Sequence, residues 1–490
     1  MCDFREEIFQ PGFDLLGAHL VEASAGTGKT YNIQNIYARL IMETDFRVSN
    51  ILVVTFTEAA TEELRERLRA ILTDLKNRLD GKACDGKDEA DVRRRAQRAD
   101  DLIGIGGGNA DDRRTKRLRV ELALNEFDNA AVSTIHGFCQ RVLRRYSFET
   151  GLGFAQNVMH NKAAELEALA EDWWRTHGEL RETQPKTPGK IKLNDLKKCV
   201  LKLGAKADYR IVSDDMTLKI ADGIVGKYER GRLERENLNF DDLLRILRDA
   251  LKNERPGHDF ADKLRGEYKA ALVDEFQDTD PVQYDIFRYI FLDRENPGPL
   301  YFVGDPKQAI YAFRGGDIYT YFKAAAGLTR HTLNVNYRST KPLMDAVNAM
   351  FGESVPGGTF GSADIAYQPA AVPAEASGAD AAERPFQLIE FDRGESSAPK
   401  NSVPDIIRIT VRRISKILAE PSVNGGKAFS PKDIAILINT TSTMPKMQQA
   451  LSRAGIPSVI RDSGNAPPLF QLLFGLDVMV TSASNLTGRR

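Results

Sequence analysis

The chain has 490 residues, of which 42% are hydrophobic and 28% charged, and its formal net charge is −1. This length allows two to four domains at roughly 100–200 residues each, and the composition is that of a globular protein with sizeable cores. The charge excludes a wholly basic protein, so any nucleic-acid surface must be local.

The cysteines and the apolar runs exclude further classes of protein. None of the four cysteines lies in a Cys-x-x-Cys pair, so the sequence favours neither a zinc site nor a disulfide framework. No signal peptide precedes the first strand, and no run approaches the ~20 apolar residues that a membrane span requires. We expect a cytoplasmic protein with no membrane partner.

Apolar runs alternate with helical spacing along the chain. Residues 19–22 predict a buried strand, and the apolar spacing from 33 to 40 predicts a helix after it. Further strands are predicted at 51–54, 271–273 and 300–303, with an amphipathic helix over 58–72. This alternation predicts an α/β fold with a parallel sheet and helices on both faces.

Two long polar stretches interrupt this pattern and are predicted to be mostly helical. The second, 155–265, contains Trp173 and Trp174 as expected core residues. Basic runs at 93–98 and 113–119 are interleaved with acids, so solvated helix faces are favoured there over DNA contacts. Residues 352–402 are rich in Pro, Gly, Ala and Ser and predict a loop, and a strand is expected at 433–438.

A glycine-rich segment follows the first strand and matches the Walker A pattern except that alanine stands at its first position. It comprises Ala23, Ser24, Ala25, Gly26, Thr27, Gly28, Lys29 and Thr30. Small residues let backbone N–H groups close around phosphate oxygens, and the following helix directs its positive end at them. Lys29 is expected at the β- and γ-phosphates of ATP, and the Thr30 hydroxyl at Mg²⁺. The alternative, a plain turn before a helix, is disfavoured by the strand–loop–helix context.

A pair of acids ends the strand at 271–273. Asp274 is in place to hold Mg²⁺, and Glu275 to orient or deprotonate the attacking water. Acids often begin loops without any catalytic role. The phosphate loop upstream is what favours a role in catalysis for this pair.

Several further motifs occur in the order seen in superfamily 1 helicases of the UvrD type. They are Val54–Ala60, Ser133–Cys139, Asp274–Thr279, Gly304–Tyr311 and Asn336–Thr340. Together with the phosphate loop and Phe240–Leu244, they resemble most the beta subunits of exodeoxyribonuclease V. The resemblance is dense over residues 15–345 and thin beyond them.

This resemblance implies a P-loop NTPase of the RecA-like type and roles for individual residues. Gln308 is implied to sense the γ-phosphate, Arg338 to act as an arginine finger, and Tyr337 to stack on the adenine. The residues implied to line a DNA path are Thr55, Phe56, Thr134, His136, Phe313 and Arg314. Aromatic side chains there would hold bases without reading sequence. Core packing remains the alternative for Phe56 and Phe313, and a capping or core role is equally favoured for His136.

The resemblance also implies a division into domains. Residues 1–75, 129–154 and 266–330 are expected to form the first RecA-like ATP-binding domain. Residues 76–128 and 155–265 are expected to form a helical insertion, and 331–490 a partial second RecA-like domain. The later helicase motifs and a nuclease domain are not found before Arg490, so we expect a truncated, frameshifted or partial chain.

The leading hypothesis is an ATP-dependent DNA helicase or translocase with family-implied 3′ to 5′ polarity. It would be a subunit, or an N-terminal fragment, of a helicase–nuclease of the exodeoxyribonuclease V type in double-strand break repair and recombination. The implied cofactors are ATP and Mg²⁺, and the partners single-stranded and duplex DNA and other subunits. The alternatives are a stand-alone UvrD-type repair helicase and a nucleotide-binding remnant without motor activity.

Overall fold

The computed structural model describes the chain in segments that fall into two compact units. The described residues are 4–105, 109–150, 157–158, 162–177, 191–204, 215–234, 237–238, 240–252, 260–293, 297–311, 316–352, 359–360, 362, 364–373, 386–389, 403–419 and 429–460. Unit 1 comprises Met1–Ser339 and Val347–Pro373, and unit 2 comprises Thr340–Ala346 and Ala374–Arg490.

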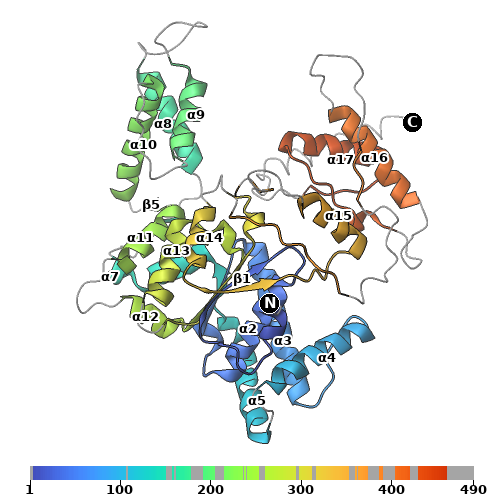
Figure 1. Ribbon diagram of the computed structural model, residues 1–490. Coiled ribbons are helices and arrows are strands. Elements are labelled where there is room, and N and C mark those ends of the chain that lie inside the picture. Colours follow the sequence, from blue (N-terminus) through green and yellow to red (C-terminus); the bar gives the residue numbers. More distant parts are fainter. Residues whose placement is uncertain are drawn as a thin grey trace, which may run out of the picture. The chain divides into compact units, whose positions relative to one another are not determined.

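Figure 1 shows the helices and strands of the two units. The elements are α1 Phe4–Glu7, β1 Ala18–Ala23, α2 Lys29–Glu43, β2 Ile51–Thr55, α3 Glu58–Leu79, α4 Glu89–Gly104, α5 Ala110–Asn125, β3 Val132–Thr134, α6 Ile135–Arg145, α7 Ser147–Thr150, β4 Asn157–Val158, α8 Lys162–Thr176, α9 Leu193–Gly204, α10 Met216–Glu234, β5 Asn237–Leu238, α11 Phe240–Lys252, α12 Phe260–Glu267, β6 Ala270–Val273, α13 Pro281–Phe287, β7 Leu300–Gly304, α14 Ile318–Ala325, β8 Thr329–Leu333, α15 Lys341–Gly352, α16 Val403–Ala419 and α17 Met444–Arg453. None of the helices in the described ranges is long and apolar enough to cross a membrane.

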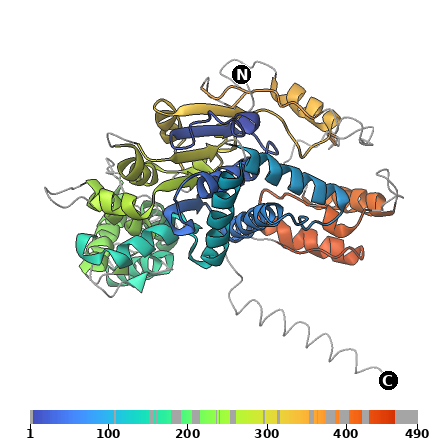
Figure 2. The ribbon, with the colours of Figure 1, turned by 90° about the horizontal axis from the view of Figure 1, so that it is seen from below.

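The centre of unit 1 is a six-stranded sheet in the order β3-β2-β6-β7-β1-β8, with every pairing parallel. The strands expected at 19–22, 51–54, 271–273 and 300–303 are confirmed as β1, β2, β6 and β7. The sequence reading missed β3 and β8. Figure 2 shows β8, in gold, alongside the blue strand β1, where Leu20 pairs with Arg330.

Successive strand residues enter two different cores, one on each face of the sheet. In β2, Ile51 and Val53 pack with α2, α3, α4 and α5, whereas Leu52 and Val54 pack with α6, α11, α12 and α13. Figure 1 shows the second set of helices grouped apart from the first. Because both faces are covered, the strands read as continuous apolar runs and not as alternating ones. The α/β class with a RecA-like parallel sheet is confirmed.

Two of the four arginines in the basic run at 93–98 face the protein, whereas Arg93 and Arg94 are exposed. Arg95 donates two hydrogen bonds of 2.8 Å to the Asp74 carboxylate of α3. Arg98 donates to the side chains of Asn35 and Gln34 and to the Tyr31 carbonyl. The expectation of a solvated face was therefore wrong for these two arginines. Their planar guanidinium groups bind acceptors on α2 and α3, which are distant in the sequence, so the local pattern of charges could not predict these contacts.

The helices α8, α9 and α10 form a separate small core within unit 1. Leu166, Leu196 and Val200 are buried in it, and Trp173 and Trp174 pack partly buried against it, close to the expectation for these tryptophans. Helices α4 and α5, by contrast, share the core of α2 and α3. The domain limits expected from the resemblance remain predictions.

Unit 2 is organised around the packing of α16 against α17. Ile407, Ile414, Met447 and Leu451 form its buried core, with the three isoleucines between 434 and 438 packed against it. The strand expected at 433–438 was wrong. A 3-10 turn covers Pro431–Asp433, and residues 434–438, which are among those described, belong to no strand.

We expect Lys116→Ala to destabilise unit 1 by about 1–3 kcal/mol, because it leaves buried acceptors without a partner. The Lys116 side chain is almost fully buried in α5. Its ammonium donates to the carbonyls of Ile103 and Ile105, at 2.9 and 2.5 Å, and pairs with Asp112. Urea unfolding of the two proteins measures the difference. Arg113→Ala, an exposed position on the same helix, is the control and should stay within about 0.5 kcal/mol of the parent. Equal losses in both variants would contradict this.

Candidate nucleotide-binding site

The groups of the candidate site lie at the carboxyl edge of the sheet. Since all six strands run parallel, segments far apart in the sequence end side by side there. The phosphate loop follows β1, Asp274 follows β6, Asp305 follows β7, and Asn336 lies shortly after β8.

The loop between β1 and α2 owes its shape to two glycines. Gly26 and Gly28 have φ angles of 79° and 95°, in the left-handed region that side chains disfavour. A Cβ at Gly26 would lie 2.7 Å from Asn336 Nδ2, so even alanine is excluded by packing as well. Helix α2 begins at Lys29, and the first N–H groups of a helix have no partner within it. The loop therefore presents N–H donors where an anion can be bound.

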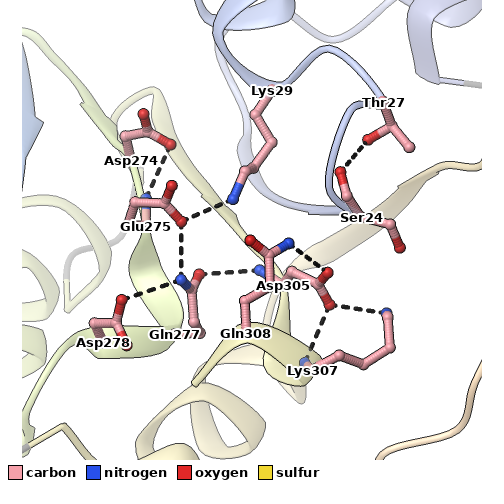
Figure 3. Close-up of polar contacts among 10 residues, drawn as sticks. All are labelled: Ser24, Thr27, Lys29, Asp274, Glu275, Gln277, Asp278, Asp305, Lys307 and Gln308. Atoms are coloured by element: carbon pink, nitrogen blue, oxygen red, sulfur yellow. Dashed lines mark hydrogen bonds and ion pairs between the residues drawn. The ribbon is translucent and has the colours of Figure 1, made fainter. Parts of the chain in front are cut away.

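Lys29 and Glu275 form the central ion pair of the site. Lys29 Nζ lies 2.7 Å from Glu275 Oε2 (Figure 3). Glu275 has φ 52° and ψ 42°, and it is the only non-glycine residue in the described ranges with a positive φ. A left-handed glutamate costs free energy, and such backbone conformations cluster at functional sites. The tight turn after β6 directs two successive acids toward the loop.

Asp274 is a carboxyl group that is difficult to ionise in this protein. The pKa of Asp274 is raised to about 6, first by withdrawal of the carboxyl from water and then by the neighbouring Glu275 carboxylate, while Lys29 and the hydrogen bond from the Glu275 N–H act in the opposite direction. One carboxylate oxygen accepts the backbone N–H of Glu275 at 2.9 Å. A buried acid with few donors fits a hard divalent cation, which takes carboxylate and hydroxyl oxygens as ligands. Asp274 and the Thr30 hydroxyl at the start of α2 remain the predicted donor set for Mg²⁺.

A network of amide and carboxylate groups joins β6 to β7. Gln277 donates to Glu275 at 2.8 Å and accepts the backbone N–H of Asp305 at 3.0 Å. Asp305 in turn accepts from Gln308 Nε2 at 2.7 Å and pairs with Lys307 at 2.8 Å (Figure 3). The sequence reading singled out Gln308 but missed Gln277 and Asp305, although both lie within the quoted motifs. The network connects Gln308 to Glu275 through the side chain and backbone N–H of Asp305 and the side chain of Gln277.

The segment after β8 is bonded directly to the phosphate loop. Asn336 Nδ2 donates to the Ala25 carbonyl at 2.9 Å, and the Tyr337 N–H donates to the Gly26 carbonyl at 2.9 Å. The Arg338 Cβ lies 2.9 Å from the position that a Cβ at Gly26 would occupy. Tyr337 and Arg338 are thus brought beside the loop, as part of unit 1. Asn336 was missed by the sequence reading, and its place in a polar motif just after a strand was the available signal.

The two threonines expected on the DNA path are largely buried. The Thr55 hydroxyl lies 2.5 Å from that of Thr61, and the Thr134 hydroxyl donates to Glu58 Oε1 at 2.9 Å and accepts from the Gly137 N–H. Their side chains shape the loop after β2 and the start of α6. A role in contacting DNA remains a prediction for both.

Two of the other expected DNA residues have described aromatic neighbours. Phe56 is half-buried, and its ring centroid lies 4.9 Å from that of Tyr311. His136 contacts Phe240 edge to face at 5.3 Å, and burial lowers the His136 pKa. Both follow strands that end at the same edge as the phosphate loop. Phe313 and Arg314 lie outside the described residues.

A glycine-shaped phosphate loop facing acids across the edge of a parallel sheet defines a P-loop protein of the RecA-like class. The sequence profile of the UvrD/REP helicase N-terminal domain matches residues 6–328. The chain belongs to this family.

Individual relatives agree with that assignment. The chain is 31% identical over 473 residues to the RecBCD enzyme subunit RecB of Mycolicibacterium smegmatis, covering 91% of this chain and 41% of that protein. It is 27% identical over 601 residues to the RecB subunit of Escherichia coli, covering 94% and 49%. The Haemophilus influenzae RecB subunit is 28% identical over 619 residues, with 91% and 49% covered. The chain thus spans less than half the length of these relatives.

We expect Asp274→Asn to stabilise the nucleotide-free protein above pH 6 while abolishing stabilisation by Mg-ATP. The raised pKa of Asp274 means that its ionised form is disfavoured in the folded state. This penalty is full about one pH unit above the folded pKa, shrinks as the pH falls through 6, and vanishes only below 4, where the carboxyl is protonated in the folded and unfolded states. The variant's advantage should therefore grow between pH 4 and 6 and stay constant above 7. Thermal unfolding with and without Mg-ATP measures both effects. A variant less stable than the parent at pH 7.5, or an equal shift with Mg-ATP, would contradict the assignment.

Proposed function

We propose that the chain is the ATP-driven part of a DNA helicase or translocase. The observation that carries the proposal is the Lys29–Glu275 ion pair beside Asp274, held at the edge where β1 and β6 end. Its relatives are named as RecB subunits of a RecBCD enzyme. We therefore propose that it acts within a helicase–nuclease in DNA break repair, with other subunits as partners and with 3′ to 5′ polarity.

Each residue of the site has a separate role in the proposed hydrolysis of ATP. The loop N–H groups bind the phosphates, and Lys29 leaves Glu275 for the β- and γ-phosphate oxygens. Asp274 and Thr30 hold Mg²⁺, which neutralises charge on the phosphates when bound. Once Lys29 has moved, Glu275 is free to accept a proton from the attacking water and to orient it. Gln308 stands on the other side of the Gln277–Asp305 network, and Arg338 supplies positive charge for the transition state.

The DNA track is proposed along the loops after β2 and β3. Phe56 and His136 follow these strands at the sheet edge that also carries the phosphate loop. Stacking of bases on aromatic rings is tolerant of sequence, as a motor that must pass any sequence requires. A movement at the phosphate loop can then be transmitted to DNA through the shared sheet.

We expect Lys29→Ala to lower DNA-stimulated ATP hydrolysis by about a hundredfold or more, because it removes the charge that faces the phosphates. Glu275→Gln should lower hydrolysis comparably but keep ATP binding, since it releases Lys29 from its ion pair. Phosphate release with and without single-stranded DNA, together with calorimetry, separates the two outcomes. Arg67→Ala, on the exposed side of α3, is the control. Retained ATP turnover in Lys29→Ala, with the fold intact, would contradict the proposal. ATP turnover in the parent that does not respond to DNA would favour a nucleotide-binding protein without motor activity.

We expect Phe56→Ala to weaken single-stranded DNA binding by ~1–3 kcal/mol, the usual contribution of one stacked base. Affinity for both proteins should fall as salt rises and vary little with sequence. Fluorescence anisotropy with labelled oligonucleotides of several sequences measures this. Phe148→Ala is the matched control, because the Phe148 side chain is 82% exposed on α7, in another part of unit 1. Equal affinities for the Phe56 variant and the parent would favour plain packing against Tyr311.

A further inference from the structure

Two histidines and a glutamate form a continuous chain of hydrogen bonds where β8 pairs with β1. His19 Nε2 lies 2.7 Å from the Asp14 carbonyl oxygen, and His19 Nδ1 lies 3.0 Å from His331 Nε2. His331 Nδ1 lies in turn 2.7 Å from Glu7 Oε2. This histidine cluster, His19, His331 and Glu7, joins α1 to both strands and to the segment that leads into β1.

The contacts of the histidine cluster require one proton more than its neutral rings carry. A carbonyl oxygen only accepts, so the proton of the first contact lies on His19 Nε2. The second contact needs a proton on one of the two facing ring nitrogens, and the third needs one on His331 or on Glu7. Two neutral imidazoles supply two protons and a carboxylate supplies none. The three hydrogen bonds therefore form together only when the cluster binds a third proton.

The surroundings of His19 exclude this third proton from its ring. His19 is 2% exposed, and its ring stacks on Phe13 and Tyr301 at centroid distances of 5.1 and 4.8 Å. The pKa of His19 is lowered to about 4, first by withdrawal from water, although the hydrogen bond to Asp14 acts in the opposite direction. The hydroxyl of Tyr301 stays neutral, because burial raises its pKa. A neutral His19 that donates from Nε2 can only accept at Nδ1.

The third proton therefore lies at the other end of the cluster. His331 must donate to His19 from Nε2, and it also faces Glu7 through Nδ1. An ordinary glutamic acid ionises at a lower pH than an imidazolium, so the proton belongs to the ring of His331 and the glutamate is the counter-ion. The Glu7 side chain is 33% exposed, so water has access to this ion pair.

Other charged groups beside the cluster are occupied with partners of their own. Arg39 of α2 is bonded to Glu43 and to the Ile8 carbonyl. Arg330, the neighbour of His331 in β8, is 58% exposed and lies 3.7 Å from Glu22. Glu7 is thus the carboxylate that pairs with the ring of His331.

We propose that the histidine cluster is a pH-sensitive switch: with the third proton bound it fastens α1 to β1 and β8, and without that proton it releases α1. A neutral His331 can donate only one of its two hydrogen bonds, so either Glu7 or His19 loses its donor. Phe4, whose ring lies 4.7 Å from that of His331, holds α1 to the same histidine. The inference does not depend on the proposed function.

The direction of the pH dependence follows from the number of protons bound. Above the ordinary histidine pKa of about 6.5, the fastened form binds one proton more than the unfolded chain, so it loses stability as the pH rises. Below 6.5 the trend reverses, because His19 stays neutral in the folded protein down to a pKa of about 4 while the unfolded ring takes up a proton. Attachment of α1 should thus be strongest between about pH 6 and 7.

The charge states can be read directly, because the chain contains only six histidines. Nitrogen NMR of protein labelled at histidine, with His19→Gln and His331→Gln for assignment, distinguishes the ring forms. At pH 7.0 we expect His331 to carry two N–H groups and His19 to carry one, on Nε2. A neutral His331 or a charged His19 at this pH would overturn the proposal.

Hydrogen exchange of residues 4–13, followed by mass spectrometry, measures the release of α1. Protection factors in the parent should fall about ten- to hundredfold from pH 7.0 to 9.0, the factor for one hydrogen bond to a charged group. His331→Gln, which cannot bind the third proton, should be less protected at pH 7.0 and show no further fall. His177→Gln is the matched control, because His177 stacks on Trp173 in another core of unit 1. It should behave as the parent does.

A second variant keeps the test decisive if His331→Gln does not fold. Glu7→Gln removes the counter-ion of the third proton, so the fall in protection should move to lower pH. A fall that stays in place in Glu7→Gln, an equal fall in His331→Gln, or a parent whose protection does not change with pH would each overturn the proposal.

Discussion

Parallel pairing of β1 with β7, and of β7 with β6, is the constraint on which the site depends. Parallel strands finish at one edge, so the loop at residue 24 meets the acids at 274 and 305 although it lies far from both in the sequence. The three strands are short, β6 and β7 are fully buried and β1 is mostly buried, and all three are held between the two cores. The packing of the two cores therefore sets the positions of the polar side chains at this edge, and the hydrogen bonds among these side chains do not. The polar network is a consequence of that packing.

The site holds its acids under electrostatic and conformational strain. Burial raises the pKa values of Asp274 and Asp278, each to about 6, and Glu275 has a backbone conformation that glutamate disfavours. Lys29 is the nearest compensating charge, and a single cation opposes three acids. A divalent cation bound at Asp274 would relieve part of this imbalance, so the same features that cost folding free energy favour binding. The acids therefore already occupy the positions that a bound cation would require.

The sequence predicted the parts of this arrangement that have a local signature. Four strands were recognisable because burial on both faces makes them uniformly apolar, and the phosphate loop because its glycines are required by backbone shape. Strand β8, Thr-Arg-His-Thr-Leu, was missed because it is a polar edge strand. Its His331 is accommodated by His19 at 3.0 Å, and burial lowers the His19 pKa to about 4. The partners of Arg95 and Arg98 are distant in sequence, so no local pattern could have assigned them. The roles of Gln308 and Arg338 and of the DNA residues came from the family resemblance and stay predictions.

The segment after β8 is fixed to the phosphate loop within unit 1. Asn336 and Tyr337 are hydrogen-bonded to the phosphate loop at Ala25 and Gly26, and the Asn336 side chain also accepts the N–H groups of Arg338 and Ser339. A shift of the loop must therefore either break these bonds or carry the segment from Asn336 to Ser339 with it. The two residues that the family resemblance assigns to the adenine and to the γ-phosphate, Tyr337 and Arg338, lie in this segment. Their distance from the bound phosphates would thus be set by the same bonds that shape the loop.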